Sequence, residues 1–373
     1  MWGSRQSRVW LTLTAILALV AASSAGDVRA QGGGGLNVYN WNDYIDEATL
    51  HRFETETGIR VRYDVYDSNE TLDAKLRAGR SGYDLVVPTA SPFLALQVPA
   101  KLYQPLDRGK LKNYGNLDPE IMRRLAAYDP GNQHAVPWMW GTTGLGYNSA
   151  AIQKVMPDAP VHSLRMLFDP AVVAKFQRCG VVVLDSPTDV VPAALNFLGR
   201  DPDSHKKEDL DAATDALMKI RPFVRKWHSS EYINDLANGD ACLAFGFSGD
   251  IKQAAKRAAE AHKDFRVIYS IPEEGSQIWI DSWVIPADAP NPAAAHRFLD
   301  FVLRPDVAAL NSNFIGYANA VPASRPMIDP AVRDDPTIYP PDEVRRRFYT
   351  ISAPDRTYER LRTRAWTRVA TGH

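Results

Sequence analysis

The sequence predicts an α/β protein with two lobes and a cleft between them. Its 373 residues exceed the roughly 150 of an average domain, which argues for two lobes. Strand and helix patterns alternate in the first third of the chain, and the alternation starts again near residue 181. Between these parts lies the aromatic and Gly-rich segment 137–144. We expect it to cross from one lobe to the other, with 271–275 as a second crossing.

The first lobe is predicted from a βαβαβ order. Asp46 can cap a helix that ends at Gly58, and Ser68 can cap a second helix that stops near Gly79. Alternating or continuous apolar residues predict strands at 36–41, 59–65 and 85–87. This order implies a mostly parallel sheet with helices on both faces.

The second half of the chain repeats the alternation. Its predicted strands are 181–184, 241–247, 265–271 and 278–285, and its predicted helices are 187–198, 204–220, one that ends near His262 and one capped by Asp355. We therefore place the first lobe at 36–140 and 274–322, and the second lobe at 141–273 and 323–373.

The first thirty residues predict a secretory signal peptide. Arg5 and Arg8 precede an apolar run at 9–22, which leads into small residues and two possible cleavage patterns, ending at Ala25 or Ala30. A membrane anchor is the alternative, but about 14 apolar residues fall short of the roughly 20 that span a bilayer. We expect residues 1–30 to be removed from an exported protein.

Composition excludes several classes of function. Hydrophobic residues make up 45% and charged residues 23% of the chain, as in soluble globular proteins. Residues 1–30 hold three Arg and one Asp, so 40 basic and 43 acidic side chains remain without them, a net charge of about −3. Proteins that bind phosphate backbones need a basic footprint, so no nucleic-acid partner is expected. The balance is compatible with a cationic ligand.

The two cysteines, Cys179 and Cys242, carry information because an exported chain meets oxidising conditions. A disulfide between them would close a loop of about 63 residues, worth roughly 4 kcal/mol in the chain-entropy description. Two buried free thiols remain the alternative at this point.

Motifs for catalysis or metal binding are missing from the sequence. It contains no HExxH, no phosphate-binding P-loop and no Gly-x-Ser-x-Gly, and its eight His are scattered without ligand spacing. We therefore expect no enzyme activity, no cofactor and no metal. A carboxylate pair suited to glycoside hydrolysis stays open, because spatial separation is not visible in a sequence.

The strand at 278–285 gives the sharpest functional signal. Period-two alternation puts Trp279, Asp281 and Trp283 on one face. A carboxylate between two Trp is costly to bury unless a cation meets it. An internal salt bridge to Arg or Lys is the alternative.

Acids next to aromatic residues recur at other strand ends. Asp43 lies between Trp41 and Tyr44 where the first strand ends, and open α/β sheets place ligands at such ends. Asp43 could instead make an Asx turn. Asp189 and Asp250 begin two predicted helices, where capping could explain them. Rings attract ammonium groups by about 0.5–2 kcal/mol each, so several acids and rings in one cleft favour a small dication.

These segments resemble the periplasmic polyamine-binding proteins, the solute receptors of bacterial ABC importers, and most of all their putrescine-binding branch. The resemblance runs from about Leu36 to the C-terminus. It is carried by YNWNDYID, ETGIRVRYDVYDSNET, YDLVVPTAS, WMWGTTGLGYN, YINDLANGDACLAFGFSGD, SIPEEG, VIPADA and RTRAWT.

The resemblance implies a type II periplasmic binding protein, a monomer whose lobes close over a polyamine by hinge bending and present it to a membrane permease. It implies an aromatic box of Trp41, Tyr44, Phe247, Trp279 and Tyr317. The implied amine-binding carboxylates are Asp43, Asp189, Asp250 and Asp281, with Glu70 as a further partner. The implied small polar contacts are Asn42, Thr89 and Ser229, and the implied disulfide is Cys179–Cys242.

The sequence departs from the putrescine-binding pattern at four of these positions. Phe247 stands where Trp is frequent, Asp189 where Glu is common, and Asn42 and Thr89 where Ser is common. A smaller ring and a shorter acid leave more room, so putrescine, spermidine, cadaverine and agmatine all stay possible. An exported hydrolase on the same architecture and a receptor for an anion or a sugar are the rival hypotheses.

Overall fold

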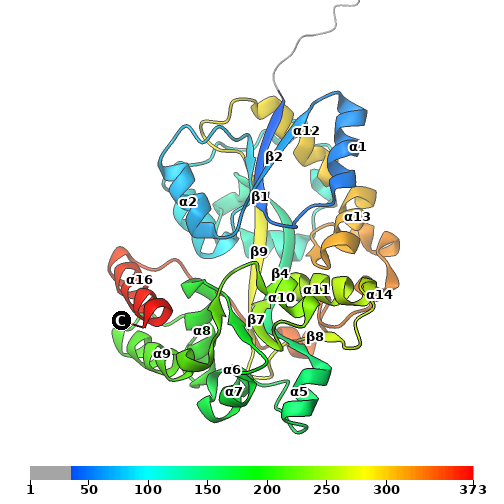
Figure 1. Cartoon of the computed structure of the whole chain (residues 1–373). Helices are drawn as coiled ribbons and strands as arrows, with labels where there is room; N and C mark the ends of the chain where they lie inside the picture. Colours follow the sequence, from blue (N-terminus) through cyan, green and yellow to red (C-terminus); the bar gives the residue numbers. More distant parts are fainter. Residues whose placement is uncertain (1–34, 373) are drawn as a thin grey trace, which may run out of the picture. The chain divides into compact units, whose positions relative to one another are not determined.

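The computed structural model describes residues 35–372, which form two lobes of mixed α/β structure (Figure 1). One hydrophobic core contains Leu36, Phe53 and Phe298, and we call the part of the chain around it the first lobe. A second core contains Val182, Phe245 and other buried residues, and the surrounding part is the second lobe. The predicted fold class is confirmed. The predicted signal peptide lies outside the described residues, and the exact lobe boundaries stay a prediction.

The first lobe begins with the predicted βαβαβ unit. β1 (Leu36–Trp41) pairs in parallel with β2 (Val61–Tyr66) and with β3 (Leu85–Val86). The helices α1 (Glu47–Thr57) and α2 (Asn69–Arg77) connect these strands. As predicted, Asp46 and Ser68 cap them by accepting hydrogen bonds from backbone N–H groups in the first turn.

The ends of this unit determine where ligand-facing residues can lie. Gly58 ends α1 in the left-handed region with φ of 71°, a conformation that a side chain would disfavour. Because the three strands run in parallel, their carboxyl ends meet at one edge of the sheet.

Further elements around this core are α3 (Ala95–Gln97), α4 (Pro119–Leu125), α12 (Pro292–Val302), α13 (Pro305–Ile315) and β10 (Ala318–Asn319).

The second lobe is built on three parallel strands. β5 (Val181–Val183) pairs with β6 (Lys226–Trp227) and with β7 (Leu243–Phe247). Its helices and remaining strand are α5 (Ser149–Val155), α6 (Arg165–Phe168), α7 (Pro170–Phe176), α8 (Pro187–Phe197), α9 (Lys207–Ile220), α10 (Tyr232–Asn238), α11 (Ser248–Glu260) and β8 (Val267–Ser270).

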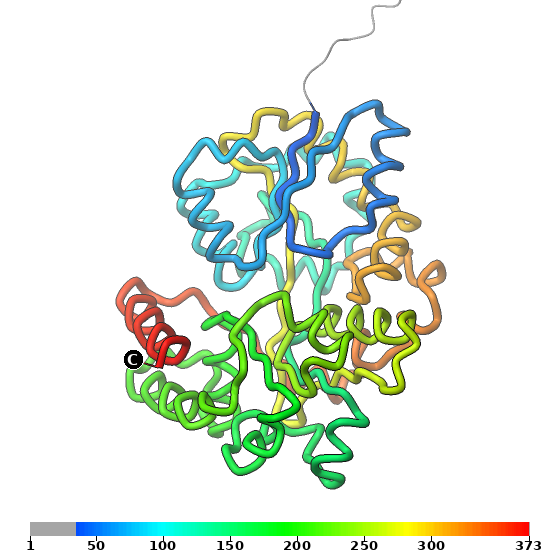
Figure 2. Tube along the Cα trace, viewed as in Figure 1, coloured from blue at the N-terminus to red at the C-terminus, as the bar shows by residue number. Residues whose placement is uncertain are grey.

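The last part of the chain returns to the second lobe. After α14 (Pro330–Arg333), α15 (Asp342–Arg345) and β11 (Phe348–Tyr349), the chain ends in α16 (Arg356–Thr371), which begins at the predicted cap Asp355. α16 packs against α8 and α9, as the red segment beside the green one shows in Figure 2. Its buried face therefore belongs to the second core.

Two long strands connect the lobes. β4 (Ala135–Asn148) pairs antiparallel with β9 (Ser276–Val284) over its first half and with β7 and β8 over its second half (Figure 1). Met139 of β4 lies in the first core and Leu145 of the same strand lies in the second. The segment predicted as the first crossing is thus part of β4.

The second crossing lies later than predicted. The backbone N–H of Glu273 donates to the carbonyl of His162, and the carboxylate of Glu274 accepts from the backbone N–H of Leu164 at 3.0 Å. These bonds hold 271–275 in the second lobe, so the chain crosses within β9. Because β4 pairs antiparallel with β7 and β8, and β9 pairs antiparallel with β3 and β4, the sheet is mixed and less parallel than predicted.

The predicted start of one helix is also wrong. The pattern favoured a helix from Ser204, but α9 begins at Lys207. The hydroxyl of Ser204 donates to the carboxylate of Asp209, which also pairs with Arg200. This local network satisfies the polar groups ahead of the helix without extending it.

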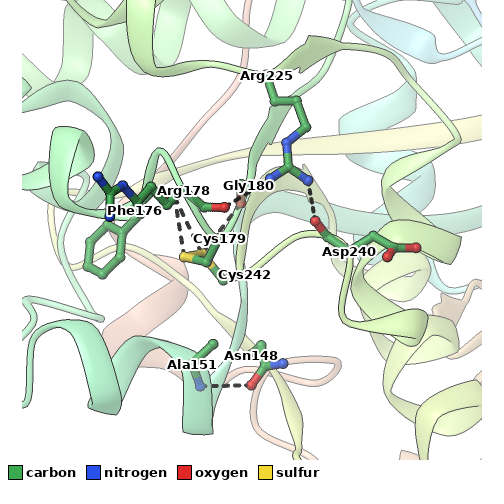
Figure 3. The surroundings of a disulfide bond; sticks show 9 residues. All are labelled: Asn148, Ala151, Phe176, Arg178, Cys179, Gly180, Arg225, Asp240 and Cys242. Carbon is green, nitrogen blue, oxygen red and sulfur yellow. Dashed lines mark hydrogen bonds between the residues drawn. A yellow bond between two sulfur atoms is a disulfide. The ribbon is translucent and has the colours of Figure 1, made fainter.

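The cysteines form the disulfide Cys179–Cys242 that the family resemblance implied (Figure 3). It links the loop after α7 to the residue that precedes β7, two segments 63 residues apart. The guanidinium of Arg225 spans the same loops, donating to the carbonyls of Asp240 and Arg178. The bond therefore ties one end of the second lobe together.

Candidate ligand-binding cleft

A cleft lies between the two cores and is lined by residues of both lobes. Every predicted binding residue except Asp43 lines it: Trp41, Asn42, Tyr44, Glu70, Thr89, Asp189, Ser229, Phe247, Asp250, Trp279, Asp281 and Tyr317. They come from the ends of β1, β3 and β7, the loop after β6, the starts of α2, α8 and α11, the middle of β9 and the turn after α13. The parallel strands thus deliver their carboxyl ends to the cleft, as open sheets do.

Asp281, in the middle of β9, is 5% exposed and is held by two hydroxyl groups. Thr89 donates to its Oδ1 at 2.6 Å, and Tyr44 donates to its Oδ2 at 2.8 Å. Burial outweighs these hydrogen bonds and raises the pKa of the Asp281 carboxyl to about 7. No salt bridge to it exists in the described part of the chain, so the alternative of an internal ion pair is wrong.

Asp250 lies in the first turn of α11 and also binds two hydroxyl groups. Tyr232 donates to its Oδ2 at 2.6 Å and Tyr317 donates to its Oδ1 at 3.0 Å. Burial raises the pKa of this carboxyl to about 6 in spite of both bonds. The helix dipole favours an acid here, but the carboxylate faces the cleft, so capping alone does not account for it.

Asp189, in the first turn of α8, is 7% exposed. Ser186 donates to its Oδ2 at 2.6 Å and Thr143 of β4 donates to its Oδ1 at 3.1 Å. Burial raises the pKa of the carboxyl. In a capping box, the Asp189 carboxylate would accept a hydrogen bond from the backbone N–H of Ser186. Here it accepts from the Ser186 hydroxyl group instead.

Glu70 lines the cleft from the first turn of α2. Its surface is accessible to solvent, yet protein surrounds the carboxyl closely enough for desolvation to raise its pKa to about 7. The charge of Asp189 adds to this rise and that of Arg362 in α16 opposes it. Glu70 thus faces the second lobe from the first.

Asp43 is the predicted binding residue that the structure places elsewhere. It is not part of the cleft lining, and its Oδ2 lies 2.9 Å from a guanidinium nitrogen of Arg257 in α11. The side chain of Gln253 donates to the backbone carbonyl of Asp43 at 3.2 Å. Because Arg257 neutralises the carboxylate, the expectation that Asp43 holds an ammonium group is corrected: it joins the two lobes.

Aromatic rings form a connected wall of the cleft. Trp279 and Tyr317 meet edge to face with centroids 4.9 Å apart, and Phe247 approaches Trp279 at 5.8 Å. Tyr44 contacts Tyr317 in the same way at 5.6 Å. The indole of Trp41 is anchored by donating to the carbonyl of Val87 at 2.8 Å. Ring faces of this kind suit methylene groups and ammonium groups alike.

Trp283 does not take part in the cleft, although it shares the strand face of Asp281. It is fully buried and packs against Trp138 and Phe298 in the first core. The face of β9 that carries these residues is therefore divided: one end lines the cleft and the other end fills the core of the first lobe.

The predicted small polar residues have internal partners. Thr89 accepts from the amide of Asn69 at 2.9 Å while donating to Asp281, which fixes the direction of its hydroxyl. Asn42 is exposed and donates to Asp43 at 3.1 Å, and the hydroxyl of Ser229 donates to the carbonyl of Asp185 at 3.2 Å. All three predicted residues border the cleft.

Sequence reasoning missed further lining residues: Asp67, Ser68, Asn69, Ser91, Ser186, Thr188, Ser230, Ile233 and Gln277. The sequence contained a pattern that could have predicted two groups of these lining residues. Residues 67–69 directly follow β2, at the same sheet edge as Trp41. Gln277 precedes Trp279 by two positions, and the period-two alternation that selected Trp279 and Asp281 extends to it.

The charge of the lining is entirely negative. It includes five carboxylates, Asp67, Glu70, Asp189, Asp250 and Asp281, and no Lys, Arg or His among the described residues. No group of three or more His, Cys, Asp or Glu side chains in residues 35–372 is arranged to hold a metal ion. Buried carboxylates without a cationic partner attract a cation strongly.

No helix in residues 35–372 is long and apolar enough to cross a bilayer.

Comparison with known proteins agrees with this geometry. Putrescine-binding periplasmic protein PotF of Escherichia coli is 49% identical over 90% of this chain and 91% of its own length. Putrescine-binding periplasmic protein SpuD of Pseudomonas aeruginosa is 47% identical over 96% of this chain and 98% of its own. Both relatives are named as binding proteins and not as enzymes. This agrees with the expectation that the protein is a receptor.

A solved structure supports the same relationship. A Listeria monocytogenes protein assigned to spermidine/putrescine ABC transport superposes with a TM-score of 0.82 at 30% identity, covering 91% of this chain and 100% of its own. The family described as "Bacterial extracellular solute-binding protein" matches residues 48–340. This chain belongs to the bacterial extracellular solute-binding protein family.

Proposed function

We propose that the mature protein is a periplasmic receptor that binds a di- or polyamine of the putrescine or spermidine type and delivers it to an ABC permease. One observation supports this most directly. Asp281, Asp250 and Asp189 are largely buried, and each is held by two hydroxyl groups in place of a basic side chain. An ammonium group would supply the missing positive charge.

The rings give the proposal its shape. A polyamine alternates methylene chains with protonated nitrogens, and the cleft combines the Trp279–Tyr317 wall with carboxylates beyond its edges. We infer that Asp281, Asp250 and Asp189 bind ammonium groups, that Glu70 contributes a further carboxylate, and that the rings contact the methylenes. Both lobes contribute, so the ligand favours the conformation in which they are together.

Titration calorimetry tests this function. The exported protein is unfolded without reductant, dialysed to remove any bound amine and refolded. It is then titrated with putrescine, spermidine, cadaverine and agmatine, with γ-aminobutyrate and glucose as controls. We expect at least one amine to bind and the controls not to bind. Absence of binding by all four amines at millimolar concentration would overturn the proposal.

The enzyme hypothesis is separated by a second measurement. Purified protein is incubated with each bound amine, and the solution is analysed by mass spectrometry. The receptor returns the amine unchanged. Product beyond one equivalent per protein would contradict the receptor function and favour an amine-processing enzyme.

A further inference from the structure

Gln277 carries a buried polar atom that nothing in the described protein satisfies. The residue is 4% exposed, lies on β9 and lines the cleft. Its Oε1 has no hydrogen-bond partner among the described residues. Buried carbonyl oxygens without a donor are uncommon, because leaving one unpaired is unfavourable. An N–H group of a ligand in the cleft would satisfy it.

The strand pairing places Gln277 at the Asp189 end of the cleft. β9 and β4 run antiparallel with Thr142 opposite Ile278, which puts Gln277 beside Thr143. The neighbouring Ser276 hydroxyl donates to the Thr143 carbonyl at 2.7 Å, and the Thr143 hydroxyl donates to Asp189. Gln277 and Asp189 are thus linked through one residue of β4.

Asp281 lies toward the opposite end of the same strand face. Gln277, Trp279 and Asp281 follow at intervals of two, and all three line the cleft. Four residues of strand separate the Cα atoms of Gln277 and Asp281 by about 13 Å, at ~3.3 Å per residue. Trp279 stands between the two polar groups, where a methylene chain would lie against its ring.

This spacing distinguishes between short and long amines. A ligand nitrogen bound at Asp281 leaves the second nitrogen of putrescine, four carbons away, near Trp279. Spermidine has a third nitrogen on a further arm, which extends toward Gln277 and Asp189. A neutral acceptor beside a carboxylate accepts two N–H bonds of one ammonium group without adding another buried charge.

We propose that Gln277 is a specificity-determining residue, whose Oε1 accepts a hydrogen bond from the distal ammonium group of a polyamine longer than putrescine. The inference rests on the proposed function and names the contact that selects ligand length. It predicts that spermidine depends on Gln277 far more than putrescine does, whereas both depend on Asp281.

The test compares two amines in four proteins by calorimetry: the wild type, Gln277→Met, Gln277→Glu and Ser282→Ala. Met keeps the length of the side chain and removes the acceptor. Glu keeps the acceptor and adds a charge. Ser282 is the matched control, because its buried Oγ also has no partner among the described residues and it lies on β9 outside the cleft lining.

We expect Gln277→Met to weaken spermidine binding about tenfold and putrescine binding less than threefold, the loss of one charge-assisted hydrogen bond. Gln277→Glu should tighten spermidine binding relative to putrescine, and Ser282→Ala should change neither. Equal losses for both amines in Gln277→Met, or no loss for spermidine, would overturn the inference. If Gln277→Met does not fold, equal effects of Gln277→Glu on both amines overturn it.

The outcomes also separate this inference from the function on which it rests. Spermidine binding that is insensitive to Gln277 but lost in Asp281→Asn removes the specificity role and leaves the receptor intact. Failure of every amine to bind the wild type removes the receptor function itself.

Discussion

Asp281 and Asp250 are both carboxylates held by two hydroxyl groups, but they differ in where those groups come from. Asp281 receives its bonds from Tyr44 and Thr89, which both belong to the first lobe. Asp250 receives one bond from Tyr232 in the second lobe and one from Tyr317 in the first. The Asp281 site is therefore complete within one lobe, whereas the Asp250 site needs both lobes together.

This difference separates two tasks. A site that is complete in one lobe can bind an amine while the lobes are apart. A site shared between the lobes forms only when they meet, so its bonds add to the stability of the closed conformation. Capture and closure would then depend on different acids, and substitutions can separate them.

Asp281→Asn should have the largest effect. It removes the charge and keeps one acceptor oxygen, for either Tyr44 or Thr89, and amine affinity should fall at least tenfold, about 1.4 kcal/mol. Calorimetry measures the change. Asp211→Asn is the control, because Asp211 is an exposed acid paired with Lys207 outside the cleft lining. Unchanged affinity in Asp281→Asn would remove Asp281 from the site.

Lowering the pH should come next in size. The pKa values of Asp281 and Glu70 are about 7 and that of Asp250 is about 6, so protons compete with the amine below neutrality. Because a carboxyl with a pKa of about 7 is almost fully protonated at pH 5, affinity should weaken at least tenfold between pH 8 and pH 5. Binding at pH 6.5 should release protons, measurable by calorimetry in buffers of different ionisation enthalpy. Equal affinity at both pH values would contradict this.

The same pKa values fix the sign of the effect on stability. A carboxyl whose pKa is raised in the folded protein binds more protons folded than unfolded between about pH 4 and 7, where the unfolded value lies near 4. The free energy of unfolding of the ligand-free protein therefore falls as pH rises through this window. Ligand removes that loss, so the ligand-induced rise in Tm should be greater at pH 8 than at pH 5.

Tyr317→Phe should have a moderate effect and sharpen the comparison directly. It keeps the ring and removes the hydroxyl that reaches Asp250 from the other lobe, so affinity should fall about fivefold, near 1 kcal/mol. Tyr232→Phe removes the bond from the same lobe. X-ray scattering should show reduced closure with ligand in Tyr317→Phe and normal closure in Tyr232→Phe. Normal closure in both would contradict the division of tasks.

Asp43→Asn should have the smallest effect on the amine. The Asp43 and Arg257 side chains are 32% and 35% exposed, and ion pairs as accessible as this one contribute about 0–1 kcal/mol. We expect affinity to change about threefold or less, with Arg257→Gln giving a similar change. A loss as large as that in Asp281→Asn would return Asp43 to the ligand-binding set.

Much of this architecture could be predicted from local patterns. The caps Asp46, Ser68 and Asp355 act through backbone groups in the adjacent turn, so a short window of sequence contains both partners. Acids and rings at strand ends were found in the same way, because parallel strands bring their carboxyl ends together.

What could not be predicted depends on distant partners. Arg257 lies 214 positions from Asp43, and no local pattern indicates that an α11 side chain of the second lobe reaches the end of β1. The late crossing within β9 depends likewise on Glu274 meeting Leu164. Gln277 is a different case: the alternation extends to it, but the predicted strand began two residues later than β9 does.

The shared strands β4 and β9 have a consequence for how the molecule comes apart. β4 contributes side chains to both cores and pairs with β7 of the second lobe, whereas β9 contributes side chains to the first core and pairs with β4. Neither lobe is a continuous stretch of chain, and the described residues from Gly35 onward form one compact unit. Loss of either core therefore frees a strand that the other needs, so heat should melt both lobes in one cooperative transition and neither can be excised as a self-standing fragment.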